Sequence, residues 1–175
     1  MKIAELDRQK YGGLEIAAGY DSAACYDMRV RSGSAVTSFE LVKNPCPRFH
    51  REYRRQLFAK DHGASRAFGL WDQGRLAAVM EILQDSKTDR TEILTLFVDE
   101  PYRRRGFGRM MLDKAREFAR GENRRAVIMR IDSCNSGAVA FALSQGLRVM
   151  GFDLTETEND DRENHVYPLL LGQTL

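Results

Sequence analysis

The second half of the chain alternates short apolar runs with polar turns, which is typical of strands in a sheet. Residues 67–71 and, apart from Glu81, residues 76–83 are apolar, and the four residues of the polar turn between them include a glycine. Two apolar runs joined by such a turn predict a β-hairpin. A second polar turn at 87–90 leads into the strongly apolar run 93–98, so we expect a third strand there.

After residue 106 the apolar spacing becomes that of a helix. The apolar positions on one helical face are Phe107, Met110, Met111, Ala115, Phe118 and Ala119. Charged residues take the opposite face, and Gly121 fits the end of the helix. The run 126–131 is almost wholly apolar, which indicates a strand covered on both faces.

A second helix is predicted at roughly 136–145, with Gly146 as its stop, because polar capping residues precede it. Apolar runs at 148–154 and 165–171 read as closing strands. This part of the chain therefore predicts an α/β fold.

The N-terminal third carries a weaker pattern. We expect a helix at 14–18, strands at 24–30 and 35–42, and a helix at 52–60. Two prolines at 45–47 predict a break in the chain between these elements.

Composition places the chain among ordinary globular proteins and excludes several classes. It has 175 residues, 43% of them hydrophobic, with a net charge of +2. This predicts one domain over 1–175, no nucleic-acid partner and no membrane span. Cys25, Cys46 and Cys134 are odd in number and widely spaced, which favours a reducing, cytoplasmic location and no metal site.

One short segment carries candidate chemistry. Arg103-Arg104-Arg105-Gly106-Phe107-Gly108 lies between an apolar strand and an amphipathic helix. Glycines allow a ligand to approach the backbone, and the free amides at a helix start attract anions. The segment therefore predicts a pyrophosphate site. The dinucleotide fingerprint fails because Met111 stands where it needs a glycine, and the P-loop triplet Gly-Lys-Ser/Thr is absent.

These residues resemble the coenzyme A signature of the GNAT superfamily of N-acetyltransferases, Arg/Gln-x-x-Gly-x-Gly/Ala. The approach to the loop, 96–102, is also similar to the family's. A second family motif is matched by Asn135, Ala138, Phe141, Gly146 and Leu147. The resemblance covers about 66–154, which is the expected acetyl-CoA-binding core. It implies the GNAT fold, a mixed and mostly antiparallel sheet flanked by helices, with two strands parting near Val98.

The resemblance implies acetyl-CoA as co-substrate, without a metal, and names the residues that would bind it. The implied set is Leu96, Phe97, Val98, Arg103, Arg104, Arg105, Gly106, Phe107, Gly108, Arg109 and Asn135. The three strand residues would offer backbone groups to the pantetheine arm and the thioester, and the loop amides would hold the pyrophosphate. Asn135 would reach the pantetheine, or it is a plain helix N-cap.

Acetylation needs a neutral amine, so a base must remove a proton at neutral pH. Glu92, eleven positions before Arg103, resembles the glutamate base of the histone acetyltransferase branch. The alternative is a solvated strand-end glutamate. Glu81, in the middle of an apolar strand, is the second candidate. Many members carry a proton-donating tyrosine where Ala142 stands here, so no side-chain acid is expected at that position. Cys134 is expected to serve in packing.

The two ends of the chain moderately resemble streptothricin acetyltransferases, at 19–42 and 151–155. An acidic run follows the second of these, with Glu156, Glu158, Asp160, Asp161 and Glu163. A small polycationic amine of the streptothricin kind is therefore the expected acceptor, which would imply antibiotic resistance. The alternatives are a protein N-terminal or lysine acetyltransferase and a non-catalytic module that binds coenzyme A. Dimers are common in this superfamily, so a homodimer is possible.

Overall fold

The computed structural model describes residues 1–153 and 167–175. In chain order the elements are β1 (Lys2–Leu6), α1 (Arg8–Tyr11), β2 (Glu15–Ser32), β3 (Thr37–Gln56), the 3-10 helix η1 (Lys60–His62), β4 (Arg66–Asp72), β5 (Arg75–Asp85), β6 (Arg90–Val98), the 3-10 helix η2 (Glu100–Tyr102), α2 (Phe107–Gly121), β7 (Ala126–Asp132), α3 (Ser136–Ser144), β8 (Arg148–Phe152) and β9 (Pro168–Thr174). These residues divide into two compact units. The first unit contains residues 1–18, 53–129 and 172–175, and the second contains 19–52 and 130–171 apart from the undescribed segment.

The first unit is built on a mixed sheet in the order β1-β4-β5-β6-β7. Its neighbours are antiparallel except for β6 and β7, which are parallel. Gln73 and Gly74, which join β4 to β5, both have positive φ angles, 49° and 80°. Such a two-residue turn matches the twist of antiparallel strands, so it fixes the predicted hairpin.

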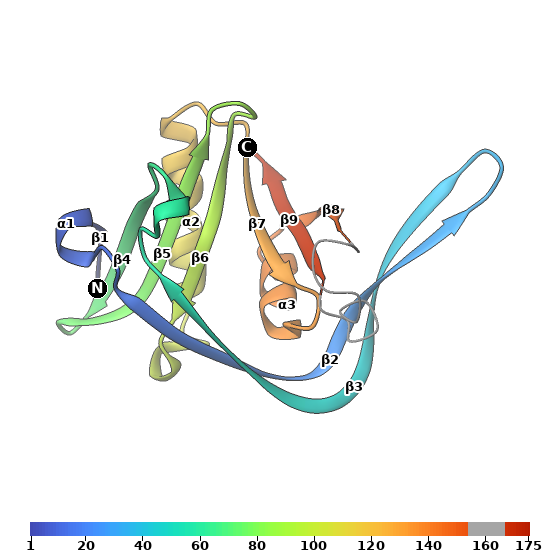
Figure 1. The fold of residues 1–175 in the computed structure, drawn as a ribbon, viewed down its shortest axis with the longest axis horizontal. Coiled ribbons are helices and arrows are strands. Elements are labelled where there is room, and N and C mark those ends of the chain that lie inside the picture. Colours follow the sequence, from blue (N-terminus) through green and yellow to red (C-terminus); the bar gives the residue numbers. More distant parts are fainter. Residues whose placement is uncertain (154–166) are drawn as a thin grey trace. The chain divides into compact units, whose positions relative to one another are not determined.

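Helix α2 covers one face of this sheet (Figure 1). The ring of Phe118 on α2 lies edge-on to Phe68 of β4, with ring centroids 5.6 Å apart. The fully buried side of the helix comprises Phe107, Met111, Leu112, Ala115 and Ala119. The opposite face carries its own apolar cluster, formed by Leu6, Ile16, Ala18, Leu57, Ala67 and Val79 with Phe97 packed against it. The two faces therefore differ in what covers them.

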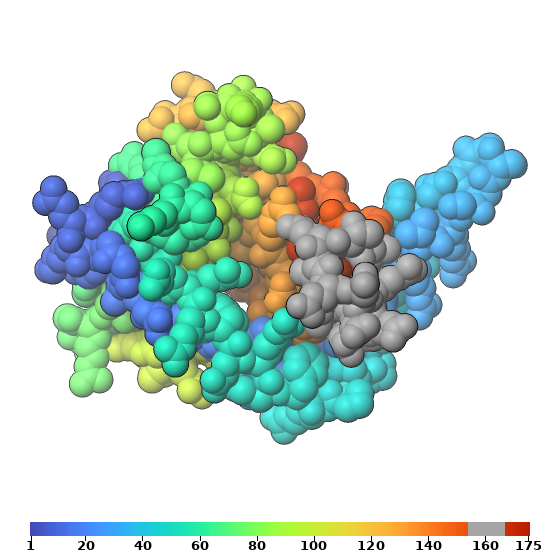
Figure 2. Space-filling view, in the orientation of Figure 1, coloured from blue at the N-terminus to red at the C-terminus, as the bar shows by residue number. Residues whose placement is uncertain are grey.

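The second unit contains residues 19–52 of the β2–β3 hairpin, including its tip, and the end of β7, helix α3, β8 and most of β9. The strands lie in the sheet order β7-β9-β8. Tyr167 joins its parts, because its hydroxyl accepts from the Met28 amide at 2.7 Å and donates to the Tyr26 carbonyl at 3.1 Å. The tip of the hairpin projects as a narrow arm, light blue in Figure 2, and exposes Val30 and Val36.

Most predictions for residues 67–152 are confirmed, with each element within a few residues of its expected bounds. In the N-terminal third, the strands predicted at 24–30 and 35–42 fall on β2 and β3, but the other predictions are wrong. Residues 14–18 and 52–60 were predicted as helices, but β2 begins at Glu15 and β3 runs to Gln56. The break expected at 45–47 is also wrong, since β3 continues through both prolines. In a two-stranded hairpin each strand has an edge without a ladder, where a proline costs no hydrogen bond.

Strand β1 and helix α1 were not predicted. Within the described residues, no helix is long and apolar enough to cross a membrane. Those same residues contain no cluster of three or more side chains that could hold a metal ion.

Candidate active site

The loop between β6 and α2 is folded back onto the end of its own strand. The Asp99 side chain accepts from the Glu100 amide at 2.9 Å and so caps η2. Arg103 then donates from its amide to the Glu100 carbonyl at 3.1 Å and from Nε to the Val98 carbonyl at 3.1 Å. Arg103 therefore holds the loop in place, which is a structural role that the sequence motif alone does not reveal.

Two residues with positive φ turn the loop into the helix. They are Arg104, with φ 62°, and Gly106, with φ 85°. Gly106 is the N-cap of α2 and has no side chain to cap it, and the first helical acceptor bond is from Met110 to the Gly106 carbonyl at 3.0 Å. The amides of the first helical turn lack intrahelical acceptors, and the helix dipole adds positive potential there. This geometry favours an anion.

The arginines of the loop differ in what they contact. The Arg105 guanidinium lies over the rings of Tyr102 and Phe107, at 5.6 Å and 5.5 Å from their centroids. Arg109 pairs with Asp113 at 3.7 Å. Arg104 is exposed and makes no ion pair with any residue that the structure describes. Arg104 is thus the cation of this loop that is free to meet an incoming phosphate.

Among the described residues, β6 pairs with β7 only over its first four residues. Its parallel register with β7 runs from Arg90↔Ala126 to Ile93↔Met129 and stops there. The strands were predicted to part near Val98, so the ladder ends five residues earlier than expected. On the other side β6 stays paired with β5, with an irregularity between Glu81 and Ile82.

The alternation of an antiparallel pair decides which backbone groups of β6 reach the free edge. The Asp99 amide donates to the Ala77 carbonyl at 2.9 Å, and Phe97 stands opposite Val79 in the same register. Residues 97 and 99 therefore direct their backbone groups toward β5, and Leu96 and Val98 direct theirs away from it. This edge can offer both backbone groups of Leu96 but only the amide of Val98, whose carbonyl accepts from Arg103, and the backbone of Phe97 is used within the sheet.

The two candidate carboxylates lie on one face of the sheet, opposite the face that α2 covers. Glu81 pairs with Thr95, and Leu83, two residues along, pairs with Glu92. Since residues two apart share a face, Glu81 and Glu92 do too. Glu92 is partly buried, whereas Glu81 is completely buried and accepts hydrogen bonds from the Phe58 amide and the Ser65 hydroxyl. The strand pattern identified both glutamates, but nothing in the sequence linked Glu81 to residues 58–65.

In the second unit, Asn135 is the N-cap of α3. Its Oδ1 accepts from the Ala138 amide at 3.1 Å, so the capping role is confirmed, and its role toward a pantetheine stays a prediction. Cys134 is buried, with the Tyr20 hydroxyl 3.0 Å from its Sγ. Burial, reinforced by that contact, raises the pKa of Tyr20. Ala142 is fully buried and supplies no acid.

Two of the three cysteines lie together on β2 and β3. The Sγ atoms of Cys25 and Cys46 are 3.3 Å apart, and both are free thiols. Burial, followed by the contact with Cys46, raises the pKa of Cys25 to about 12. The acidic residues Glu156, Glu158, Asp160, Asp161 and Glu163 lie outside the described residues.

The Acetyltransferase (GNAT) family matches residues 34–147, well over half of the chain. No protein with a curated description matches it.

Among solved structures, two similar folds span nearly the whole chain. A putative streptothricin acetyltransferase from Bacillus anthracis, solved with acetyl coenzyme A, has a TM-score of 0.79 and 14% identity, and the match covers 99% of this chain and 97% of the other. A nourseothricin acetyltransferase has a TM-score of 0.72 and 17% identity, with the same coverage. A chimeric spermidine N-acetyltransferase from Vibrio cholerae matches only 64% of this chain and 70% of the other, with a TM-score of 0.55 and 17% identity.

Proposed function

Because the chain belongs to the GNAT family of acetyltransferases, we propose that it moves the acetyl group of acetyl-CoA to a primary amine of a small polycationic compound of the streptothricin kind. The chain is an acyltransferase by family. The observation that carries the proposal is the turn at Arg104 and Gly106. It presents uncapped helix amides beside an arginine that has no ion pair with any described residue. A pyrophosphate fits this site, since anions bind at helix N-termini.

The co-substrate supplies the activated acetyl group as a thioester. The loop amides at 104–109 would hold its pyrophosphate, and the free edge of β6 would receive its pantetheine arm. Leu96 and Val98 direct backbone amides to that edge, where they could stabilise the negative charge on the thioester oxygen during attack. Such preorganised donors contribute roughly 2.7–4 kcal/mol when one is removed from a known enzyme. A thiolate is a tolerable leaving group, so the alanine at 142 is compatible with turnover.

The streptothricin-like acceptor rests on how much of the chain the fold comparisons cover. The two folds described above that span nearly the whole chain are of acetyltransferases named for streptothricin or nourseothricin. Other acetyltransferase folds cover 63–67% of the chain. The acidic run at 156–163 would add attraction for a polycation, because clefts of one charge concentrate the opposite one. We place the reaction in the cytoplasm, which suits three free thiols, and expect a homodimer.

Acetyl transfer also needs the ammonium group of the acceptor to lose a proton. Glu92 is the first candidate for the base, acting directly or through a water. Glu81 has no exposed surface, so it could act only through a neighbour.

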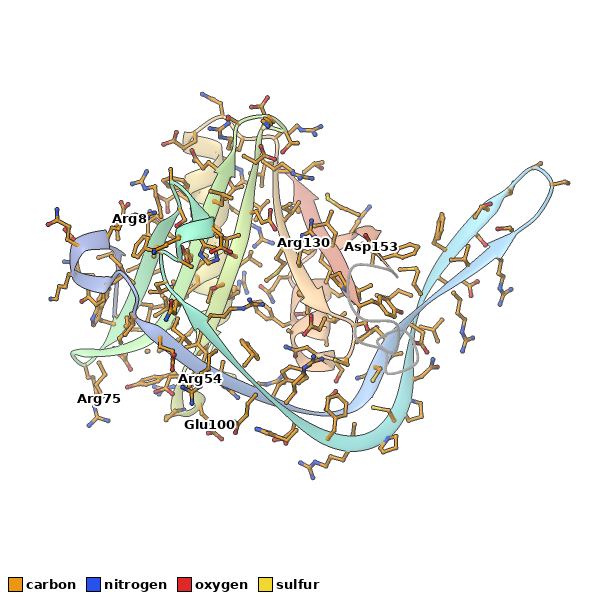
Figure 3. The ribbon with its side chains drawn as sticks, in the orientation of Figure 1. Arg8, Arg54, Arg75, Glu100, Arg130 and Asp153 are labelled. Atoms are coloured by element: carbon orange, nitrogen blue, oxygen red, sulfur yellow. The ribbon has the colours of Figure 1, made fainter. Side chains whose placement is uncertain are left out.

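Replacing Glu92 by glutamine should lower kcat by roughly 10²–10⁴-fold at pH 7. The loss should shrink as the pH rises toward the pKa of a lysine-type amine, about 10.4, because the neutral amine then forms unaided. The matched control is Glu100→Gln, an exposed glutamate in η2 labelled in Figure 3. Full activity of Glu92→Gln at pH 7 would remove Glu92 from the reaction.

The proposed function is tested by an acetyl-CoA turnover screen against streptothricin, simple polyamines, aminoglycosides and peptides. We expect release of free thiol with streptothricin or a polyamine, and one added acetyl group on the amine by mass spectrometry. Acetylation of a peptide N-terminus alone would contradict the proposed small-molecule acceptor but not the family assignment. Binding of acetyl-CoA without turnover on any amine would favour the non-catalytic module.

A further inference from the structure

The buried carboxylate of Glu81 is held on one side only. Its Oε1 accepts from the Phe58 amide at 3.0 Å and from the Ser65 hydroxyl at 2.6 Å. Its Oε2 is also buried and has no hydrogen-bond partner among the described residues. A fully buried carboxylate is costly unless a positive or proton-bearing group accompanies it. The surroundings of Glu81 should therefore contain such a group.

That group is the imidazole of His62, at the end of η1. Its Nδ1 lies 3.1 Å from Glu81 Oε1, and its side chain is 19% exposed while that of Glu81 is 0% exposed. Nδ1 is close enough to Oε1 for an ion pair, but it is not aligned for a hydrogen bond. Catalytic hydrogen bonds are often poorly aligned before the ligands bind. His62 therefore connects a buried carboxylate to solvent.

The other neighbours of the pair do not compete for this role. Arg8, labelled in Figure 3, donates from Nη2 to the Ser65 hydroxyl and to the Gly63 and Ser65 carbonyls, so it reaches Glu81 only through Ser65. Thr95 faces Glu81 from β6 and does not titrate. Lys60 and Asp61 flank His62 on η1 and are both exposed. Among the described residues, His62 is thus the titratable side chain in contact with this carboxylate.

A pocket lies one residue away from Glu81. This open pocket of about 430 Å³ lies next to Ser65 and is lined by Glu5, Leu6, Asp7, Arg8, Phe58, Ser65 and Arg66. The side chains of Glu5 and Arg66, which both line the pocket, form a hydrogen bond, and this bond lowers the pKa of Glu5. Phe58 and Ser65, which both donate to Glu81, separate this pocket from the carboxylate.

The chemistry of the proposed function requires a route for a proton. An ammonium group and a thioester give an amide, a free thiol and one proton, so a proton must leave the site in every turnover. Glu92, which would take that proton, lies on the same sheet face as Glu81 and must be deprotonated again. Imidazole is the side chain that gains and loses protons near neutral pH, which suits it to such a transfer.

We propose that His62 is a proton shuttle, which receives at Nε2 the proton that Glu92 removes from the amine and passes it to solvent, with Glu81 as the positioning residue. In this step the O–H bond of Glu92 breaks and an N–H bond forms at Nε2. The regenerated carboxylate stays on Glu92, and the imidazolium then gives its proton to water or buffer. This inference rests on the proposed function.

The test measures kcat of His62→Gln at low and high buffer concentration. We expect at least about a tenfold loss at low buffer, with recovery as imidazole or another small buffer is added, because the buffer replaces the shuttle. The wild type should not depend on buffer concentration. The matched control is His50→Gln, an exposed histidine on β3, which should behave as the wild type. Wild-type kcat for His62→Gln at low buffer would overturn the shuttle.

A second measurement tests the pair without turnover. The ring nitrogen chemical shifts of His62 report which nitrogen carries the proton in the neutral form. We expect the Nδ1–H tautomer in the wild type, facing Glu81, and a mixture in Glu81→Gln. The same tautomer in both proteins would overturn the positioning role. Absence of turnover with every amine would instead defeat the proposed function and leave this measurement valid.

Discussion

Two helices in this protein follow strands of the sheet, and their first turns are completed in opposite ways. Helix α3 is capped by Asn135, whose side chain accepts from the Ala138 amide. Helix α2 starts at Gly106, which has no side chain for this purpose and a left-handed backbone. Helix α3 satisfies one of its N-terminal amides with its own capping side chain, whereas the N-terminal amides of α2 are left for a ligand.

The difference indicates where an external anion belongs. A capping side chain competes with a ligand for the same amides, so a capped helix is a poor anion site and an uncapped one a good one. The neighbourhood agrees, because Arg104 beside the uncapped turn lacks an ion partner among the described residues. Three variants test the comparison, in order of decreasing effect.

The largest effect is expected from Gly106→Val with Gly108→Val. Side chains at these positions would stand where the pyrophosphate must approach the backbone. The dissociation constant of acetyl-CoA should rise at least tenfold, about 1.4 kcal/mol, as measured by calorimetry.

Gly146→Val provides the control for backbone strain. Gly106 and Gly146 have φ angles of +85° and +83°, and an added Cβ at either would meet no atom within 4 Å. Both changes should therefore lower the melting temperature, since left-handed backbone is unfavourable for valine. Only the change at 106 and 108 should weaken acetyl-CoA binding. Unchanged affinity for acetyl-CoA in a folded double variant would contradict the assignment of the pyrophosphate site to the N-terminus of α2.

A smaller effect is expected from Arg104→Gln, which removes a charge and keeps a side chain of similar reach. Acetyl-CoA affinity should fall about two- to fivefold at low salt, in line with the strength of exposed ion pairs. The difference from the wild type should narrow at about 1 M salt, where the screening length is about 3 Å. The matched control is Arg75→Gln in the β4–β5 hairpin, labelled in Figure 3. A loss of affinity that ignores salt would argue against a phosphate contact.

The smallest effect on binding is expected at the capped helix. Asn135→Ala should cost about 1 kcal/mol of unfolding free energy, and Asn135→Ser should recover most of it, because serine also caps. Both should bind acetyl-CoA within about twofold of the wild type. A serine variant of normal stability that binds ten times more weakly would show that the Asn135 amide group contacts the co-substrate.

The sequence predicted the start of α2 well because the signals for it lie within a few neighbouring residues. Gly106 has the left-handed backbone that favours glycine, and the amphipathic stripe from Phe107 to Ala119 fixes the helix that follows. The β4–β5 hairpin was predictable for the same reason, since Gln73 and Gly74 form its turn.

In the N-terminal third the sequence predicted strand at 24–30 and 35–42 but not the full length of β2 and β3. Strands β2 and β3 depend on pairing between residues that lie far apart in the sequence. One example is the ion pair between Arg54 and Glu15, at 2.8 Å. The segment 51–55, in which every residue except Tyr53 is charged, carries no period of two that would mark it as a strand. The partners of Glu81 were missed for the same reason, because Phe58, His62 and Ser65 approach it only through the tertiary fold.

The most direct measurement of the central claim is an amide-resolved NMR titration of the protein with coenzyme A. The account predicts that the largest shift changes fall on the amides of 104–109, at the uncapped start of α2, with smaller changes at 136–138, at the capped start of α3. Large changes at 136–138 with none at 104–109 would contradict it.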